Sequence, residues 1–245
     1  MKIPEFKSIQ THLLYTLIVI AIVAFIVLAS YNGKVTQNDF ATSFLALLGT
    51  FLGATLAFRL NENKELAKLH ATQRESLNRA IFVLARQHNA LHQLKNDLDK
   101  YKSKIELALN LPAFKPPTYT DLVHNFSDLE FLLDSKNPNL LLKLTVEQER
   151  FHQALESLRI RNEFYVTELQ PAIAKLSLNG KSLTTDQLAE ALGERIFGCL
   201  IHGANNAQEH IYASCASLPE MYSEVRQLAK EIYPNHKFLN YEIPA

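Results

Sequence analysis

The sequence predicts an all-α protein: an N-terminal two-helix transmembrane hairpin, then a long stalk helix and a cytoplasmic helical bundle. Three observations predict this fold class. Two runs near the N-terminus, Ser8–Gly33 and Phe40–Phe58, contain no Lys, Arg, Asp or Glu. No Pro or Gly interrupts the chain from Ala54 to Leu111. The rest of the chain carries a normal share of charges and has no alternating strand pattern.

We therefore expect three parts. The transmembrane hairpin covers residues 1–58, with spans at about 12–31 and 40–58. The stalk helix covers residues 59–110, and the helical bundle of residues 111–245 packs on the stalk.

The first predicted span runs from His12 to Tyr31 and consists mainly of Ile, Val, Leu and Phe. A helix of about 20 apolar residues crosses the hydrocarbon core, because its backbone hydrogen bonds are satisfied internally. A cleaved signal peptide is the alternative, with Lys2 and Lys7 before the apolar run and a cleavage pattern at Val27–Ala29. The run is longer than a typical signal-peptide core, which favours a retained helix.

The second predicted span, Phe40–Phe58, has a different composition. Small residues recur in it every three or four positions: Thr42, Ala46, Gly49, Gly53 and Ala57. Small residues allow two helix backbones to approach closely in lipid, where apolar surface alone drives little association. We expect Gly49, Gly53 and Ala57 to form a packing stripe. The stripe either packs against the first span of the same chain or also joins copies of the chain into a homo-oligomer.

Charges on either side of the spans predict the topology. The connecting loop carries only Lys34 and Asp39, whereas the outer flanks carry six basic residues: Lys2, Lys7, Arg59, Lys64, Lys68 and Arg74. Lys and Arg gather on the cytoplasmic side of membrane helices. We expect a bacterial inner (plasma) membrane protein whose N-terminus and C-terminal domain are both cytoplasmic.

A heptad pattern marks one face of the stalk. Its apolar positions are Leu77, Leu84, Leu91, Leu98 and Ile105, and a second set three residues later is Ala80, Gln87, Leu94, Tyr101 and Ala108. Such spacing is typical of a coiled-coil seam or of one face of a helical bundle. The seam can pair with later helices of the same chain or with a second copy; enough apolar helix follows to favour the first arrangement.

Turn and cap residues divide the remainder. A proline-rich break at Leu111–Thr118 precedes a short helix over about Tyr119–Leu133. Asn137-Pro138 opens a helix that reaches about Leu178 and is kinked or split at Pro171. Two final helices are expected, one from Thr184 or Thr185 to about Ser217 and one from Pro219 to about Ile232.

Residues that could carry chemistry are few. His88 and His92 could reach one metal ion from successive helical turns, but no third ligand is apparent. The set Cys199, His202, His210 and Cys215 spreads along one predicted helix, too far apart for one site. The glycines of that helix, Gly193, Gly198 and Gly203, provide either close helix packing or a hinge.

Other function classes find no support in the sequence. It shows no phosphate-binding loop, dinucleotide fingerprint or nucleophile elbow, so we expect no enzyme activity and no cofactor. With 25 basic and 25 acidic residues, we expect no direct nucleic-acid binding. The predicted spans lack the ionisable residues that a proton relay or a transporter requires, apart from His12 at an edge.

A short hairpin followed by the membrane-exit segment FLGATLAFRLNENKE and a helical cytoplasmic domain resembles the two-transmembrane effectors of bacterial antiphage defence, including those encoded beside retrons. The resemblance covers roughly residues 10–110 and rests on architecture, without a diagnostic motif. It implies an effector that damages the inner membrane when infection is sensed. It also implies a cytoplasmic protein or nucleoprotein partner, in addition to the lipid bilayer. The alternative function is a non-toxic anchor or scaffold that recruits a cytoplasmic protein.

Overall fold

The computed structural model describes residues 22, 37–114, 119, 121–178 and 180–242. Within these residues all regular structure is helical and no strand occurs, which confirms the predicted all-α class. The chain divides into two compact units, residues 1–70 and residues 71–245. The first predicted span lies outside the described residues except for Ile22, so the two-helix hairpin stays a prediction.

The longest helix, α2 (Gln37–Leu98), begins in the first unit and ends in the second. It contains the second predicted span and the first four leucines of the predicted seam. Leucines, alanines and charged residues with good helix propensity fill it after Ala54, and no Pro or Gly follows that position. Among the described residues, α2 is the helix that is long and apolar enough to cross a membrane.

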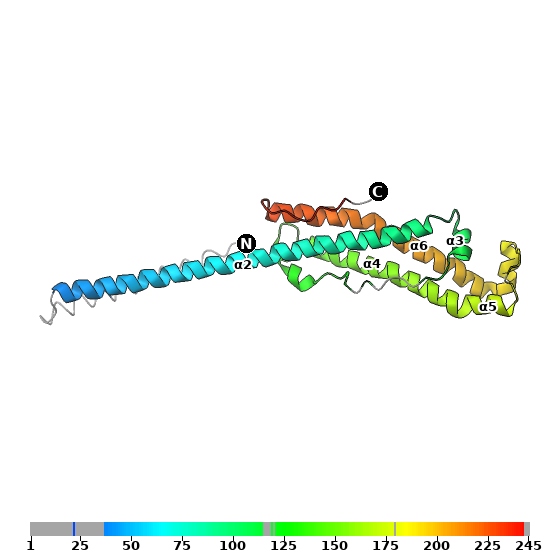
Figure 1. Cartoon of the computed structure of the whole chain (residues 1–245), viewed down its shortest axis with the longest axis horizontal. Helices are drawn as coiled ribbons and strands as arrows, with labels where there is room; N and C mark the ends of the chain where they lie inside the picture. The colour runs from blue at the N-terminus through cyan, green and yellow to red at the C-terminus, as the bar shows by residue number, and fades with distance from the viewer. Residues whose placement is uncertain (1–21, 23–36, 115–118, 120, 179, 243–245) are drawn as a thin grey trace. The chain divides into compact units, whose positions relative to one another are not determined.

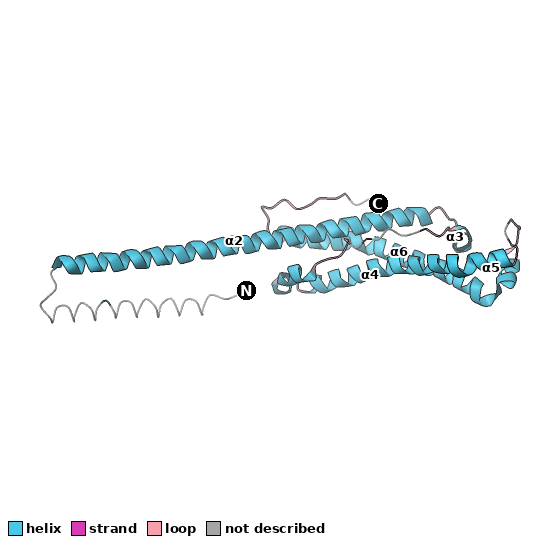
Figure 2. Ribbon diagram, turned by 60° about the horizontal axis from the view of Figure 1, so that its bottom comes forward, coloured by secondary structure: helices cyan, strands magenta, loops and turns pink. Residues whose placement is uncertain are grey.

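In the second unit three long helix segments enclose one core. They are residues 71–98 of α2, helix α4 (Asn139–Phe164) and helix α6 (Thr185–Ile232). Figures 1 and 2 show α4 and α6 running beside this part of α2. The short helix α3 (Lys104–Asn110) packs on α6.

The stalk helix is shorter than the sequence predicts. Helix α2 ends at Leu98, and α3 starts a new helix at Lys104. The reason is a local cap: the Ser103 hydroxyl accepts the Glu106 N–H (3.1 Å), while the Glu106 carboxylate accepts the Lys102 N–H (2.8 Å). The first bond satisfies one of the free N–H groups of the new helix, and the second holds the residue just before its N-cap. The prediction of one helix over 59–110 is therefore wrong beyond Leu98.

The middle of the chain follows its turn residues closely. A 3-10 helix, η1 (Phe126–Asp134), occupies part of the predicted short helix. Pro138 is the N-cap of α4, as Asn137-Pro138 predicts. A π-helical turn, η2 (Tyr165–Leu169), separates α4 from α5 (Gln170–Lys175), which carries Pro171 at its start. The helix is therefore altered before Pro171 by the π-helical turn, while the backbone at Phe164, Leu169 and Gln170 keeps helical dihedral angles, so it is not split at Pro171 itself.

Helix α6 departs from the prediction at two positions. Thr184 caps its start through a reciprocal pair of bonds with Gln187. Gly193 has φ +78° and interrupts the helical backbone, and no described residue lies within 4 Å of a Cβ placed there, so close packing does not explain this glycine; the hinge stays a prediction. The predicted break at Pro219 is absent, and α6 continues to Ile232. Buried neighbours such as Leu218 and Val225 stabilise the helix on both sides of Pro219, which offsets a cost of about 3 kcal/mol for an interior proline.

Candidate functional site

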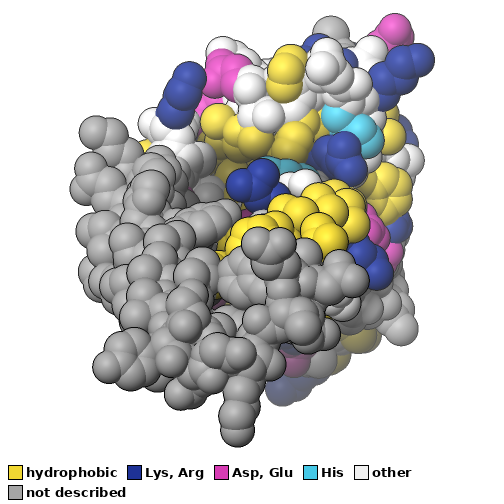
Figure 3. All heavy atoms as spheres, turned by 90° about the vertical axis from the view of Figure 1, so that its left-hand side faces the viewer, with side chains coloured by type: hydrophobic (Ala, Val, Ile, Leu, Met, Phe, Trp, Pro, Cys, Tyr) yellow, Lys and Arg dark blue, Asp and Glu magenta, His cyan; other side chains and the backbone are white. Residues whose placement is uncertain are grey.

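The apolar part of α2 in the first unit has no buried residue. None of its apolar window is buried, and Leu45 and Phe58 are 68% and 78% exposed. Exposed apolar side chains also appear as yellow surface in Figure 3. Water-soluble proteins rarely leave so long an apolar stretch uncovered, because its transfer out of water is favourable. The segment Thr42–Phe58 is therefore the apolar surface on which a candidate site can be sought.

Two faces of this segment differ in exposure. Phe44, Phe51 and Thr55 are partly covered, whereas Gly49 and Gly53 are exposed. At about 100° per residue these two sets lie on opposite sides of the helix. No described residue lies within 4 Å of a Cβ placed at Gly49 or Gly53. The predicted packing stripe, with the exposed Ala57, is therefore open for close backbone approach.

Two hydroxyl groups in the segment, those of Thr50 and Thr55, are satisfied within the helix. Thr50 Oγ1 donates to the Ala46 carbonyl oxygen at 2.9 Å, and Thr55 Oγ1 donates to the Phe51 carbonyl oxygen at 2.8 Å. Unsatisfied polar groups are costly in hydrocarbon. These bonds remove that cost for both threonines.

The predicted seam behaves as the core of the second unit over four heptads. Leu77, Leu84, Leu91 and Leu98 are each at most 1% exposed and belong to the shared core. Ile105 lies on α3 instead and is 44% exposed, because the new helix that Ser103 starts has its own phase. The seam is therefore a face packed inside the chain, and it ends at Leu98.

Gln87, the polar member of the second heptad set, is fully buried in a hydrogen-bonded layer. Its Nε2 donates to the Leu122 carbonyl oxygen (2.9 Å) and to Gln148 Oε1 (3.1 Å). Gln148 Oε1 also accepts the His124 N–H at 3.2 Å. The layer fixes the loop before η1 onto α2 and α4. Sequence reasoning identified Gln87 as an exception but gave no partner for it.

A buried arginine that the sequence did not single out holds the proline-rich segment. Arg161 on α4 is 2% exposed, and its guanidinium donates to the carbonyl oxygens of Leu111 and Pro112. The next residue, Asn162, donates to the Phe114 carbonyl oxygen at 2.5 Å. The guanidinium lies 4.8 Å from the Tyr165 ring centroid in a cation–π contact. A buried Arg cannot be recognised from spacing alone, since most arginines are exposed.

The candidate metal ligands do not converge. His88 is buried and stacks on His92 with ring centroids 5.7 Å apart; burial, and then His92, lower the pKa of His88. Cys199 is exposed, and Cys215 is buried, which raises the pKa of its thiol to about 11. Within the described ranges no group of three or more His, Cys, Asp or Glu side chains is placed to hold a metal ion.

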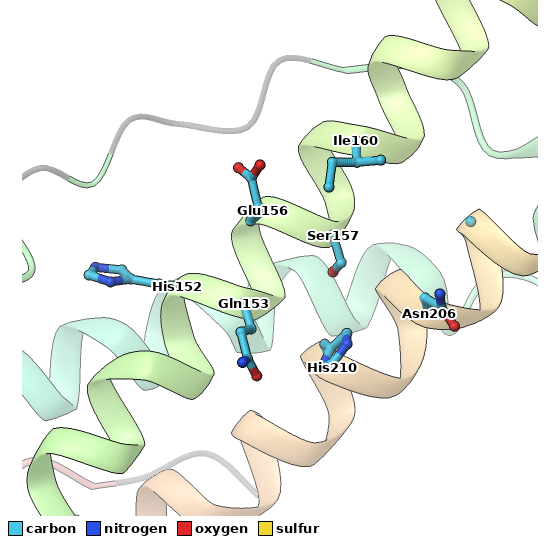
Figure 4. A pocket seen from close by; sticks show the side chains of 8 residues that line it. His152, Gln153, Glu156, Ser157, Ile160, Asn206 and His210 are labelled. Atoms are coloured by element: carbon cyan, nitrogen blue, oxygen red, sulfur yellow. The ribbon is translucent and has the colours of Figure 1, made fainter.

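A groove of about 520 Å³ lies between α4 and α6. Figure 4 shows Ser157 and Gln153 turned toward the space between the helices, with His210 opposite, whereas His152 and Glu156 point away. The groove therefore has polar walls but no convergent acid, base and nucleophile. Gly203 forms part of it, and an added Cβ there would make only an ordinary contact, 3.7 Å from Arg161 Cγ.

Comparison with known proteins adds no relative: no protein-family model, curated protein or solved structure matches the chain.

Proposed function

We propose that the protein is a membrane-anchored effector whose helical domain controls an apolar helix in the bilayer. One observation carries this proposal. A single helix, α2, is apolar and exposed over Thr42–Phe58 and becomes the buried seam of a folded domain from Leu77 onward. A rearrangement of the domain can act on the membrane segment through that helix, because no Pro or Gly interrupts it after Ala54.

The proposal includes the parts that rest on sequence. His12–Tyr31 forms the other arm of a transmembrane hairpin, both termini lie in the cytoplasm, and the membrane is the bacterial inner membrane. A cytoplasmic protein or nucleoprotein restrains the effector until infection is sensed. The open stripe Gly49–Gly53–Ala57 then associates with copies of itself and perturbs the bilayer, as the architectural resemblance to antiphage effectors implies.

Induction in bacteria containing a membrane-potential dye tests this function. We expect the full chain to depolarise cells and a chain lacking residues 1–58 to leave the potential unchanged. Gly49→Leu and Gly53→Leu should abolish depolarisation, because a leucine prevents close backbone approach. Ala54→Leu also introduces a leucine, at a position outside the stripe, and should retain depolarisation. Equal depolarisation by all three variants would exclude the stripe, and no depolarisation by the full chain would exclude the effector function.

The second candidate is a non-toxic anchor that recruits a cytoplasmic protein. An exposed apolar patch on the folded unit favours it: Leu142 is 65% exposed and lines a groove with Val146 and Met221. The ion pair Lys143–Glu224 lies at the same groove, with Nζ 2.7 Å from Oε1. An anchor predicts harmless induction and retained recruitment when an unrelated transmembrane helix replaces residues 1–58.

A further inference from the structure

The chain after α6 is non-helical and mostly exposed, yet it makes several specific contacts with the helices. Helix α6 ends at Ile232, and the described tail continues through Tyr233 to Glu242. Phe238 is only 8% exposed, and the His236 ring packs edge-on against it with centroids 4.8 Å apart. Terminal segments are usually poorly ordered unless contacts tie them down. The contacts of this tail therefore show what holds it against the helices.

One set of contacts reaches the first turns of α2 in the second unit. The Tyr233 hydroxyl donates to Gln73 Oε1 at 2.6 Å, and the Arg74 guanidinium lies 5.9 Å from the centroid of the Tyr233 ring. Six residues later in the tail, the Leu239 N–H donates to Asn78 Oδ1 at 3.0 Å. The tail thus contacts α2 over the residues where its buried part begins.

A second set of contacts reaches α6. The Leu239 carbonyl oxygen accepts hydrogen bonds from Arg226 Nε (3.0 Å) and from the Tyr222 hydroxyl (3.4 Å). The same hydroxyl accepts the Tyr241 N–H at 2.7 Å, and the two tyrosine rings meet edge to face. Figures 1 and 2 show the tail turning back from the end of α6 along α2. The tail therefore bridges α6 and α2.

The start of the buried part of α2 has few core contacts of its own. Ala71, Thr72 and Glu75 are exposed, and the first seam residue with no exposed surface is Leu77. From Leu77 to Leu98, by contrast, every seam leucine lies in the core. A helix turn with little apolar burial opens more readily than the turns that follow it. The contacts from the tail lie on these weakly buried residues of α2 and can therefore stabilise them.

We propose that residues 233–242 form a strap that fastens residues 71–80 of α2 to α6, and that release of the strap loosens these residues while the seam from Leu84 to Leu98 stays packed. The consequence for function rests on the proposed effector activity: the strap sets how readily a change in the folded domain reaches the membrane segment. A partner that displaces the tail would then act as a trigger.

Hydrogen exchange on the full-length chain in detergent micelles tests the strap directly. The double variant Asn78→Ala/Tyr222→Phe removes the Asn78 amide, which binds Leu239, and the Tyr222 hydroxyl, which binds Leu239 and Tyr241. It keeps the buried ring of Tyr222 and the Arg226 bond to Leu239. We expect amide exchange over residues 71–80 to rise at least about tenfold, with exchange over 84–98 unchanged. A chain ending at Tyr233 should give the same pattern.

Gln227→Ala is the matched control, since Gln227 is exposed on α6 and bonds only to Glu231 in the described contacts (3.0 Å). It should leave exchange at the wild-type rate. Unchanged exchange over 71–80 in both strap variants would overturn the proposal, and so would a rise spread evenly over 71–98.

Depolarisation of cells by the same variants separates the strap from the proposed function. If the strap restrains the effector, the strap variants should depolarise cells at lower induction than wild type and than Gln227→Ala. Faster local exchange with an unchanged depolarisation threshold would overturn the regulatory role. If wild type and every variant leave the potential intact, the effector function fails while the exchange result still decides the strap.

Discussion

The two halves of α2 are similarly rich in leucine but bury it very differently. Leu45, Leu52 and Leu56 are more than half exposed, whereas Leu77, Leu84 and Leu91 have no exposed surface. The second half is covered by α4 and α6, which the first unit lacks among the described residues. A heptad pattern with polar neighbours thus marks a face that protein covers, and the charge-free run marks an apolar surface that is exposed in the described structure. Four predictions sharpen this contrast.

The largest expected effect is on the buried half. Leu84→Ala should lower the free energy of unfolding of the second unit by about 2–5 kcal/mol, because it removes buried methyl groups and leaves a cavity. Leu52→Ala, in the exposed half, should change it by less than about 0.5 kcal/mol. Urea unfolding of the full chain in detergent, followed by circular dichroism, measures both. Equal losses for the two variants would mean that the two halves share one environment.

Acid should weaken the buried unit through His124. Burial lowers the pKa of His124 from 6.5 to about 4. Because the folded pKa lies below the unfolded one, folding disfavours the protonated form. Its neutral form therefore supports full stability above pH 6.5, and stability falls as the pH drops toward 4. The complete loss for this shift is about 3 kcal/mol.

The urea midpoint measured between pH 7 and pH 4.5 checks this prediction. His124→Leu should flatten the decline, whereas His202→Leu, at an exposed position, should not. A decline of the same steepness in His124→Leu would assign the pH dependence to other groups, among which His88 shifts in the same direction.

Next in size is the loss of the buried arginine. Arg161→Leu leaves the carbonyl oxygens of Leu111 and Pro112 without their donor, which should cost about 2 kcal/mol. Arg159→Leu, two residues away, breaks exposed ion pairs with Glu156 and Glu163 and should cost under about 1 kcal/mol. Thermal unfolding of both variants distinguishes them. A cost for Arg161→Leu no greater than for Arg159→Leu would contradict the role assigned to the buried side chain.

Much of the fold followed from patterns that act locally. The seam from Leu77 to Leu98, the opening of α4 at Pro138 and the cap at Thr184 each depend on residues close in sequence. The end of α2 at Leu98 was not predicted. The Ser103 cap is also local, but it competes with strong helix propensity on both sides, and the pattern did not show which of the two prevails. The continuity of α6 through Pro219 depends on burial against other helices, which no local pattern reports.

The candidate site was predicted unevenly for the same reason. A charge-free run and its glycines are visible in the sequence, so the apolar segment and Gly49, Gly53 and Ala57 were identified directly. Gln87 bonds to Leu122, 35 residues away, and to Gln148, 61 residues away, and Arg161 bonds to loop carbonyl groups 49 and 50 residues away. Such contacts are set by tertiary packing, as is the return of the C-terminal tail to α2.

The smallest expected effect on folding concerns the small-residue stripe. Gly53→Leu should change the unfolding free energy of the second unit by less than about 0.5 kcal/mol, because no described residue lies near an added Cβ. Any loss of function in this variant then reflects altered association in the bilayer. Urea unfolding beside wild type checks this, and a loss above about 1 kcal/mol would show that the stripe supports the folded unit.

Spin labels on the two sides of the charge boundary directly test whether residues 42–58 lie in lipid. Single cysteines at Leu52 and at Lys64 are labelled in a Cys199→Ser/Cys215→Ala background, and the full chain is reconstituted into liposomes. We expect dissolved oxygen to relax the label at Leu52 strongly and a water-soluble nickel complex to relax it weakly. At Lys64 we expect the nickel complex to have the stronger effect. Equal access of the nickel complex to both labels would contradict a lipid-embedded 42–58 segment.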